Sequence, residues 1–115
     1  MNELELESPA PRHSLECPVE DWLGFLGHRW NALLLWHLQD GMRRHSELAA
    51  LLPGVSPKVL SERLQGLEAR RLLERFLITG FPRGVGYRLT SSGKALVPIL
   101  DQLEVWSRKF DQPVA

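Results

Sequence analysis

The strongest constraint on the fold is a short run of turn and capping residues between two helical patterns. Pro53 and Gly54 form a turn, and Ser56 followed by Pro57 is a strong signal for a new helix. Proline suits the first helical turn because its fixed φ is helical and its missing N–H has no partner there. A helix, a glycine-containing turn and a second helix over residues 46–71 therefore predict a helix-turn-helix.

Both helices of this unit are predicted to have one apolar and one polar face. Ser46 is expected to cap the first helix, because its hydroxyl can accept a hydrogen bond from the first turn. In the second helix, Leu60, Leu64 and Leu67 recur at helical spacing and are expected to face the core. At about 100° per residue, the opposite face carries Lys58, Ser61, Glu62, Gln65 and Ala69.

Beyond the second helix the sequence changes from helical spacing to alternation. Residues 73–78 and 85–89 alternate in polarity, and a loop rich in glycine and proline separates them at 80–84. This pattern is typical of two antiparallel strands joined by a hairpin loop. Residues 72–89 are therefore predicted to form a two-stranded β-hairpin wing with Arg83 at its tip.

Helices are also expected on either side of this central unit. Residues 17–40 predict two helices: Pro18 opens the first, and the apolar run Ala32–Trp36 places the second in the middle of the core. The expected fold class is therefore α+β and mostly α, a winged helix-turn-helix with N- and C-terminal helices available for dimerisation.

The final helix, predicted over 90–110, is expected to be capped by Thr90 and to be kinked or shifted by Pro98. Its apolar stripe has the three-and-four spacing of a coiled coil. Pairing of two chains through this stripe would set two helix-turn-helix units about 34–36 Å apart, one turn of duplex DNA. Packing of the stripe within its own chain is the alternative. The predicted dimer interface comprises Trp22, Leu96, Ile99, Leu103, Trp106 and Phe110.

The net charge of the chain is zero, but the charges are unevenly distributed. Residues 1–21 carry six acidic side chains and one arginine, whereas residues 43–94 carry ten lysines and arginines against four acidic residues. A cationic segment that coincides with a helix-turn-helix and a hairpin is typical of a surface that faces nucleic acid. Ordinary solvated charge is the alternative.

The sequence predicts a DNA interface on the second helix of the unit, on the residues before the first helix and at the hairpin tip. Mixed donors and acceptors on one helix face suit base edges in a major groove, and a helix N-terminus favours phosphate. An arginine at a hairpin tip suits the minor groove or a phosphate. The candidate DNA-binding residues are Ser56, Lys58, Ser61, Glu62, Gln65, Arg43, Arg44 and Arg83.

Length, apolar runs and cysteine content exclude several classes of protein. The 115 residues fit one domain, predicted over 17–115 behind a flexible acidic arm at 1–16. A secretory signal and a membrane-length apolar run are absent, and a lone cysteine forms no internal disulfide, so a cytoplasmic location is expected. The four histidines lack metal-ligand spacing and there is no phosphate-binding glycine loop, so no enzyme, metal or cofactor is expected.

Several motifs in the same order and spacing resemble the HxlR-type winged-helix regulators, most of all the members that sense thiol and quinone stress. The resemblance runs from Cys17 to about Phe110 and implies a homodimeric bacterial regulator of operator DNA, with dimerising terminal helices, a recognition helix from Ser56 and a wing loop at 80–84. One departure is Gly86, since similar wings carry an acidic residue just before the tyrosine. The motifs are Cys17-Pro18-Val19, Gly27-His28-Arg29-Trp30, Arg43-Arg44-His45-Ser46-Glu47-Leu48, Gly54-Val55-Ser56-Pro57-Lys58-Val59-Leu60, Arg63-Leu64, Leu67-Glu68, Leu73-Glu74-Arg75 and Tyr87-Arg88-Leu89-Thr90.

Cys17 is a candidate sensor of oxidants or electrophiles. It precedes a helix start, where the helix dipole lowers a thiol pKa, although Glu16, Glu20 and Asp21 oppose this effect. The resemblance implies sensing, because some members use a cysteine here to detect quinones; an inert cap is the alternative. Two other functions stay open: a winged helix that recruits protein, and a regulator that binds a small molecule between its tryptophan-rich helices.

Overall fold

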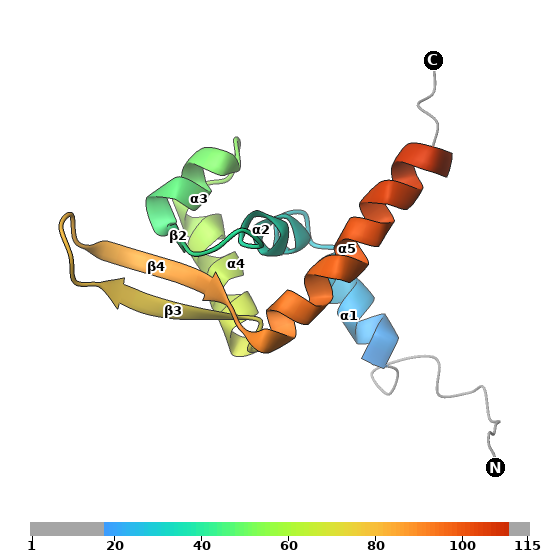
Figure 1. Ribbon diagram of the computed structural model, residues 1–115, viewed down its shortest axis with the longest axis horizontal. Coiled ribbons are helices and arrows are strands. Elements are labelled where there is room, and N and C mark those ends of the chain that lie inside the picture. Colours follow the sequence, from blue (N-terminus) through green and yellow to red (C-terminus); the bar gives the residue numbers. More distant parts are fainter. Residues whose placement is uncertain (1–17, 111–115) are drawn as a thin grey trace, which may run out of the picture.

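The computed structural model describes residues 18–110, so the predicted arm at 1–16 and Cys17 lie outside the described residues. Figure 1 shows a wing projecting from one end of the molecule and two helices, α1 and α5, crossing at the other. The predicted fold class, α+β and mostly helical, is confirmed. In order the elements are α1 (Pro18–Leu26), α2 (Asn31–His37), β2 (Arg43–Arg44), α3 (His45–Leu51), α4 (Pro57–Ala69), β3 (Leu73–Ile78), β4 (Gly84–Leu89) and α5 (Ser91–Phe110).

The sheet has three antiparallel strands in the order β2-β4-β3, one more than the predicted two-stranded hairpin. The additional strand, β2, pairs Arg43 with Tyr87 and Arg44 with Gly86. A strand of two residues is too short to show any alternation, so the expectation of two strands was wrong for a physical reason. The β3–β4 hairpin itself forms where it was predicted, with Arg75 opposite Tyr87.

The core is built almost entirely from leucine and lies where α2, α3, α4 and the sheet meet. Leu60, Leu64 and Leu67 of α4 are at most 1% exposed, which confirms the predicted inner face of that helix. The expectation that α2 lies in the middle of the core holds for one face only: Leu34 and Leu35 are fully buried, whereas Leu33 and Trp36 are 41% and 37% exposed. The seven residues of α2 form about two turns, so one face of the helix packs on the core and the opposite face meets solvent.

Two of the three predicted N-caps are confirmed. The Ser56 Oγ accepts a 3.1 Å hydrogen bond from the Val59 N–H at the start of α4, and the Thr90 Oγ1 accepts one of 3.1 Å from the Gly93 N–H at the start of α5. Ser46 is not a cap, because α3 already begins at the residue before it, directly after β2.

The cap of α3 is instead Arg44. The carboxylate of Glu47 accepts a 2.7 Å hydrogen bond from the Arg44 backbone N–H, which satisfies one of the donors that a helix start leaves free. The extended backbone of β2 thus runs straight into the helix, and no residue is left over for the predicted serine cap.

Helix α4 ends two residues before the predicted Arg71, in a turn that brings α5 close. Arg71 has φ of 62°, the Leu72 N–H donates to the Leu67 carbonyl at 3.0 Å, and the Arg71 N–H donates to the Glu68 carbonyl at 2.9 Å. These two bonds form a Schellman motif, in which the left-handed position usually holds glycine. An arginine there stores backbone strain.

The start of α5 packs directly onto this turn. The Thr90 N–H donates to the Leu72 carbonyl at 3.0 Å, and a Cβ built on Gly93 would lie 2.1 Å from the same oxygen. Only glycine fits so close to a backbone carbonyl. The end of the fourth helix and the start of the fifth are therefore held in one fixed arrangement.

The fifth helix continues across Pro98, so the proline does not shift the helix start. Of the predicted apolar stripe, Leu96 packs against the core, whereas Ile99, Leu103, Trp106 and Phe110 are 53–61% exposed. Packing within the chain therefore accounts for only the first turn of the stripe. No helix within residues 18–110 is long and apolar enough to cross a membrane.

Candidate nucleic-acid interface

A polar groove lies between α4, the start of α3 and the wing. It encloses about 810 Å³ and is open to solvent along its length. Three arginines and a histidine line it against a single carboxylate, so its charge balance is positive. The lining residues are Arg44, His45, Ser46, Ser61, Gln65, Glu68, Arg75, Arg83, Gly84, Val85 and Tyr87.

The predicted polar face of α4 is exposed as expected and borders this groove. Ser61 and Gln65 line the groove itself, whereas Lys58 and Glu62 are exposed beyond it. Ser56 is also exposed, although one lone pair of its hydroxyl is used in capping α4. The helix therefore presents side chains with both donors and acceptors outward while its leucines hold it to the core.

The three arginines predicted to meet DNA lie in different surroundings. Arg83 is exposed on the wing and lines the groove. Arg44 also lines the groove, but its Nη1 donates a 2.8 Å hydrogen bond to the carbonyl of Pro82 and so ties β2 to the wing loop. Arg43 is absent from the groove lining; its Nε donates to the His37 carbonyl at the end of α2, at 3.0 Å.

Seven of the groove residues were not among the predicted candidates, and three of them, His45, Arg75 and Tyr87, contribute rings or positive charge to it. The His45 Nε2 lies 3.5 Å from the Ser61 Oγ, and the His45 and Tyr87 rings are 6.3 Å apart, so these side chains connect α3, α4 and β4. Arg75 lies opposite Tyr87 in the hairpin register. Pairing the two predicted strands would have placed Arg75 beside the tyrosine, whereas nothing local places His45 there.

The outer face of the wing gives a reason for Gly86. A Cβ at this position would lie 2.7 Å from the Phe76 ring, which covers the glycine across the hairpin. The Arg88 guanidinium lies 4.7 Å from the centre of the Phe76 ring and forms a 3.0 Å ion pair with Glu74. An aromatic ring over a strand glycine stabilises the pair, so the packing of Phe76 requires glycine at position 86.

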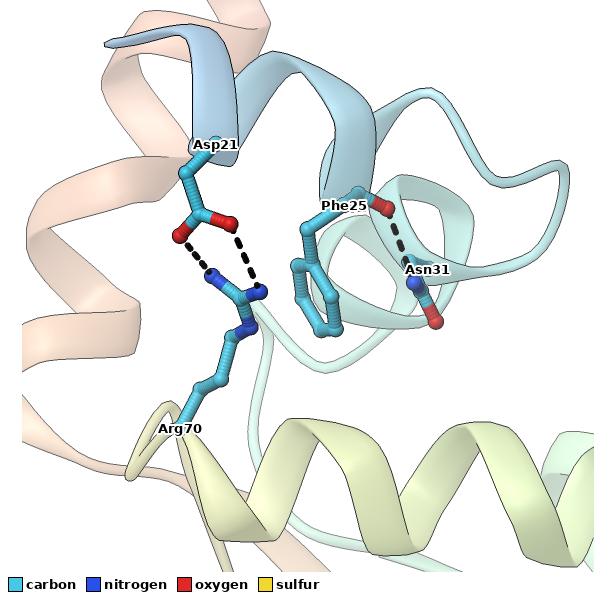
Figure 2. A network of polar contacts seen from close by, with 4 residues as sticks. All are labelled: Asp21, Phe25, Asn31 and Arg70. Carbon is cyan, nitrogen blue, oxygen red and sulfur yellow. Dashed lines mark hydrogen bonds and ion pairs between the residues drawn. The ribbon is translucent and has the colours of Figure 1, made fainter. Parts of the chain in front are cut away.

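Helix α1 has no fully buried residue, but Trp22, Phe25 and Leu26 pack against the core. Figure 2 shows two of its polar contacts, from Arg70 and Asn31. Arg70, at the end of α4, forms a 3.1 Å ion pair with Asp21 and stacks 4.0 Å from the Phe25 ring centre and 4.7 Å from that of Trp22. The buried Asn31 donates through Nδ2 to the Phe25 carbonyl at 2.9 Å. The Arg70 side chain, at the end of α4, therefore helps to hold α1 in place.

Within residues 18–110, no three His, Cys, Asp or Glu side chains gather where they would hold a metal ion. The groove contains hydroxyl, amide, imidazole and guanidinium groups, whose chemistry suits phosphates and base edges. The arrangement of three helices, a basic groove and a projecting hairpin is that of a winged helix-turn-helix.

Comparison with known proteins points the same way. An uncharacterized HTH-type transcriptional regulator of Bacillus subtilis, YvaP, is 41% identical over 98 residues, which cover 84% of this chain and 91% of that protein. The reduced form of the B. subtilis regulator YodB aligns with a TM-score of 0.76 and 36% identity, over 86% of this chain and 98% of that one. Quinone-bound YodB aligns at 0.73 and 36%, over 82% and 99% of the two chains.

The oxidized form of the redox regulator HypR aligns with a TM-score of 0.75 and 33% identity, over 85% of this chain and all of that one. These names describe transcriptional regulators, a class of proteins that are not enzymes, which agrees with the expectation for this chain. A family model described as an HxlR-like helix-turn-helix matches residues 25–114. The chain belongs to this HxlR-like family of helix-turn-helix transcriptional regulators.

Proposed function

We propose that the chain binds a specific operator duplex as a homodimer, with α4 in the major groove and the wing beside it. The observation that carries the proposal is the groove lined by Arg44, Arg75 and Arg83, which adjoins the exposed polar face of α4. A cationic concave surface suits the phosphate backbone, and the polar helix face suits the base edges next to it.

The residues of α4 divide the proposed contacts between bases and backbone. Ser61 and Gln65 present a hydroxyl and an amide to base edges, and the carboxylate of Glu62 can accept from a cytosine amino group. Lys58, in the first turn, contacts phosphate as a point charge. Ser56 keeps its hydroxyl proton to donate to a phosphate, since its hydrogen bond to Val59 uses only the oxygen as acceptor.

In this proposal the arginines contact the DNA, mainly its phosphate backbone. Arg83 reaches the minor groove or a phosphate from the wing. Arg43 and Arg44 each use one N–H within the chain, and their remaining guanidinium donors are available to phosphate.

Two copies are proposed to meet through α5 and α1, at the end of the molecule away from the wing (Figure 1). The exposed stripe of α5 consists of large side chains, two of them aromatic. Leu23 on α1 adds another exposed apolar side chain, at 66%. Apolar grooves flank α5 on both sides and suit the side chains of an identical helix. One groove includes Trp22, Leu26, Leu96 and Ile99, and the other includes Leu33, Trp36, Leu100 and Leu103.

The proposal is tested by fluorescence anisotropy with a labelled duplex from upstream of the gene for this chain, at physiological salt and with excess random DNA. Specific complexes form at about 10⁻⁸–10⁻¹¹ M, whereas nonspecific ones need about 10⁻⁴–10⁻⁶ M. If random DNA removes all binding, duplexes selected from a random library replace the probe. Failure of that selection would overturn operator binding and favour a role in recruiting protein.

We also propose that Cys17 makes operator binding responsive to oxidants or electrophiles. In the sequence it directly precedes Pro18, the first residue of α1, and Glu20 and Asp21 follow in the first turn of that helix. The positive end of a helix favours a thiolate, and nearby carboxylates oppose it. Support comes from relatives described as a redox regulator and as quinone-bound. With one cysteine per chain, an oxidant joins two chains or attaches a small thiol, and a quinone adds directly to the thiolate.

The test is operator affinity before and after treatment with benzoquinone or diamide plus a thiol. Wild type is expected to lose affinity, and Cys17→Ser is expected to bind equally well with and without treatment. An unchanged response in Cys17→Ser would rule the sensor out.

A further inference from the structure

Phe81, in the loop at the far end of the wing, is 98% exposed, more than any other large apolar side chain of residues 18–110. Burying a phenylalanine side chain is favourable, because its apolar surface leaves water. The wing does not use this energy for folding, although Phe76 in the same hairpin lies against Gly86. Phe81 therefore offers a large apolar side chain, at a defined place on the wing, that a partner could bury.

The backbone beside Phe81 is tied to the body of the molecule. Arg44 donates its 2.8 Å hydrogen bond to the carbonyl of Pro82, the next residue. A Cβ on Gly84 would lie 3.1 Å from the Arg44 Nη1, so the guanidinium also lies close against the returning strand. A loop held in this way loses less conformational entropy when its side chains are buried by a partner.

The charge around Phe81 selects the partner. Residues 79–84 contain one arginine and no acidic residue, and Arg83 lines the groove that adjoins α4. The acidic residue of β3, Glu74, is paired with Arg88 on the outer face of the wing. Phe81 is thus an apolar side chain two residues from a cationic groove residue, Arg83, and the partner that suits both is a polyanion with an apolar interior, such as duplex DNA.

We propose that Phe81 is an apolar wedge that enters the minor groove beside each half-site and partly unstacks one base step, bending the duplex. This inference rests on the proposed operator binding. Apolar side chains inserted between base steps kink DNA, and a neighbouring arginine holds the narrow groove electrostatically. Phe81 and Arg83 divide these two tasks, with Arg44 fixing the loop from which both project.

The experiment uses full-length protein and a duplex selected by the wild type from a random library, with 2-aminopurine placed at successive positions outside each half-site. Unstacking raises the fluorescence of this base. Wild type is expected to raise it at one step on each side, and donor–acceptor labels on the duplex ends are expected to report a bend. Phe81→Ala should abolish both signals and weaken binding about tenfold, since base–aromatic contacts are worth about 1–3 kcal/mol.

Two variants separate the wedge from general damage. Phe81→Leu keeps an apolar side chain and should retain the bend and the fluorescence signal. Arg83→Ala should weaken binding and its salt dependence while the remaining complex still shows the unstacked step. Because Phe81 is exposed, its alanine variant should melt within a degree or two of the wild type.

Wild-type affinity and bending in Phe81→Ala, or a wild type that raises no fluorescence at any position, would overturn the wedge while leaving operator binding intact. Normal DNA binding with lost regulation in a purified transcription reaction would assign Phe81 to a protein partner and overturn it as well. Operator binding itself fails separately, if the wild type selects no duplex.

Discussion

The two ends of this molecule differ in how far contacts within one chain complete their surfaces. At the wing end, Arg44 donates a hydrogen bond to the wing loop, and the side chains of Ser56 and Glu47 accept hydrogen bonds from backbone N–H groups at two helix starts. The groove is formed within one chain. At the α1–α5 end, apolar side chains are left in solvent and α1 depends on Arg70 and Asn31. The groove of the proposed DNA surface is thus preorganised within one chain, whereas the proposed dimer surface leaves its apolar side chains to be covered by a second copy.

The largest effect is expected from a charge placed in the proposed dimer surface, measured as a loss of operator affinity at the other end of the molecule. Leu103→Glu places a carboxylate in the middle of the exposed stripe and should yield monomers, as sedimentation would show. Two half-sites bound together gain about 10²–10⁴ in avidity. Operator affinity should therefore fall by about that factor, while the melting temperature of the dilute protein changes little. Gln102→Glu, at a neighbouring exposed position, is the matched control and should leave both properties close to wild type.

The junction between the two ends should be the least tolerant point. Gly93→Ala forces a methyl group to within 2.1 Å of the Leu72 carbonyl and should lower the free energy of unfolding by about 3 kcal/mol, since relief requires moving backbone. Gly24→Ala, with open space around its Cβ in α1, should instead stabilise by about 0.5–1 kcal/mol. Urea unfolding at one protein concentration compares them, and equal effects would contradict the close packing described here.

Arg70→Ala should destabilise α1 without affecting the wing. Its ion pair is partly exposed and is worth little, so most of the expected loss of about 1 kcal/mol comes from stacking on Phe25 and Trp22. Hydrogen exchange should quicken in α1 and stay unchanged in β3 and β4. Arg88→Ala, which removes a similar stacked ion pair from the wing, should show the reverse pattern.

The smallest expected effect is a gain. Arg71→Gly relieves the left-handed backbone at the end of α4 and should raise the free energy of unfolding by about 0.5 kcal/mol, since glycine relieves the strain but is more flexible when unfolded. Arg71→Ala, which keeps a Cβ at φ of 62°, should bring no such gain.

Sequence reasoning succeeded where the information is local. Ser56 with Pro57 gives the start of α4, and the leucine spacing gives its inner face, because both depend on residues within two turns. It failed where partners are distant: β2 exists only through pairing with β4, and Arg70 meets Asp21 across 49 residues. The cap at Ser46 failed for the same reason, since strand pairing fixes where α3 begins.

The candidate interface divides in the same way. Exposure of Lys58, Ser61, Glu62 and Gln65 follows from helical periodicity alone. The surroundings of Arg43 and Arg44 do not, because one guanidinium meets the end of α2 and the other meets the wing loop. Adjacent, identical residues in the sequence thus have different duties in the fold.

Three consecutive residues, Arg70, Arg71 and Leu72, connect the fourth helix to both helices of the opposite end: the first through its side chain, the second through its turn and the third through its carbonyl. In the proposed dimer built on α5, these three residues connect the recognition helix of each chain to the dimer interface. A rotation of about 5° there moves the far end of the thirteen-residue helix by about 2 Å. In the proposed dimer, the spacing between the two recognition helices therefore depends on how rigidly these three residues hold the fourth and fifth helices together.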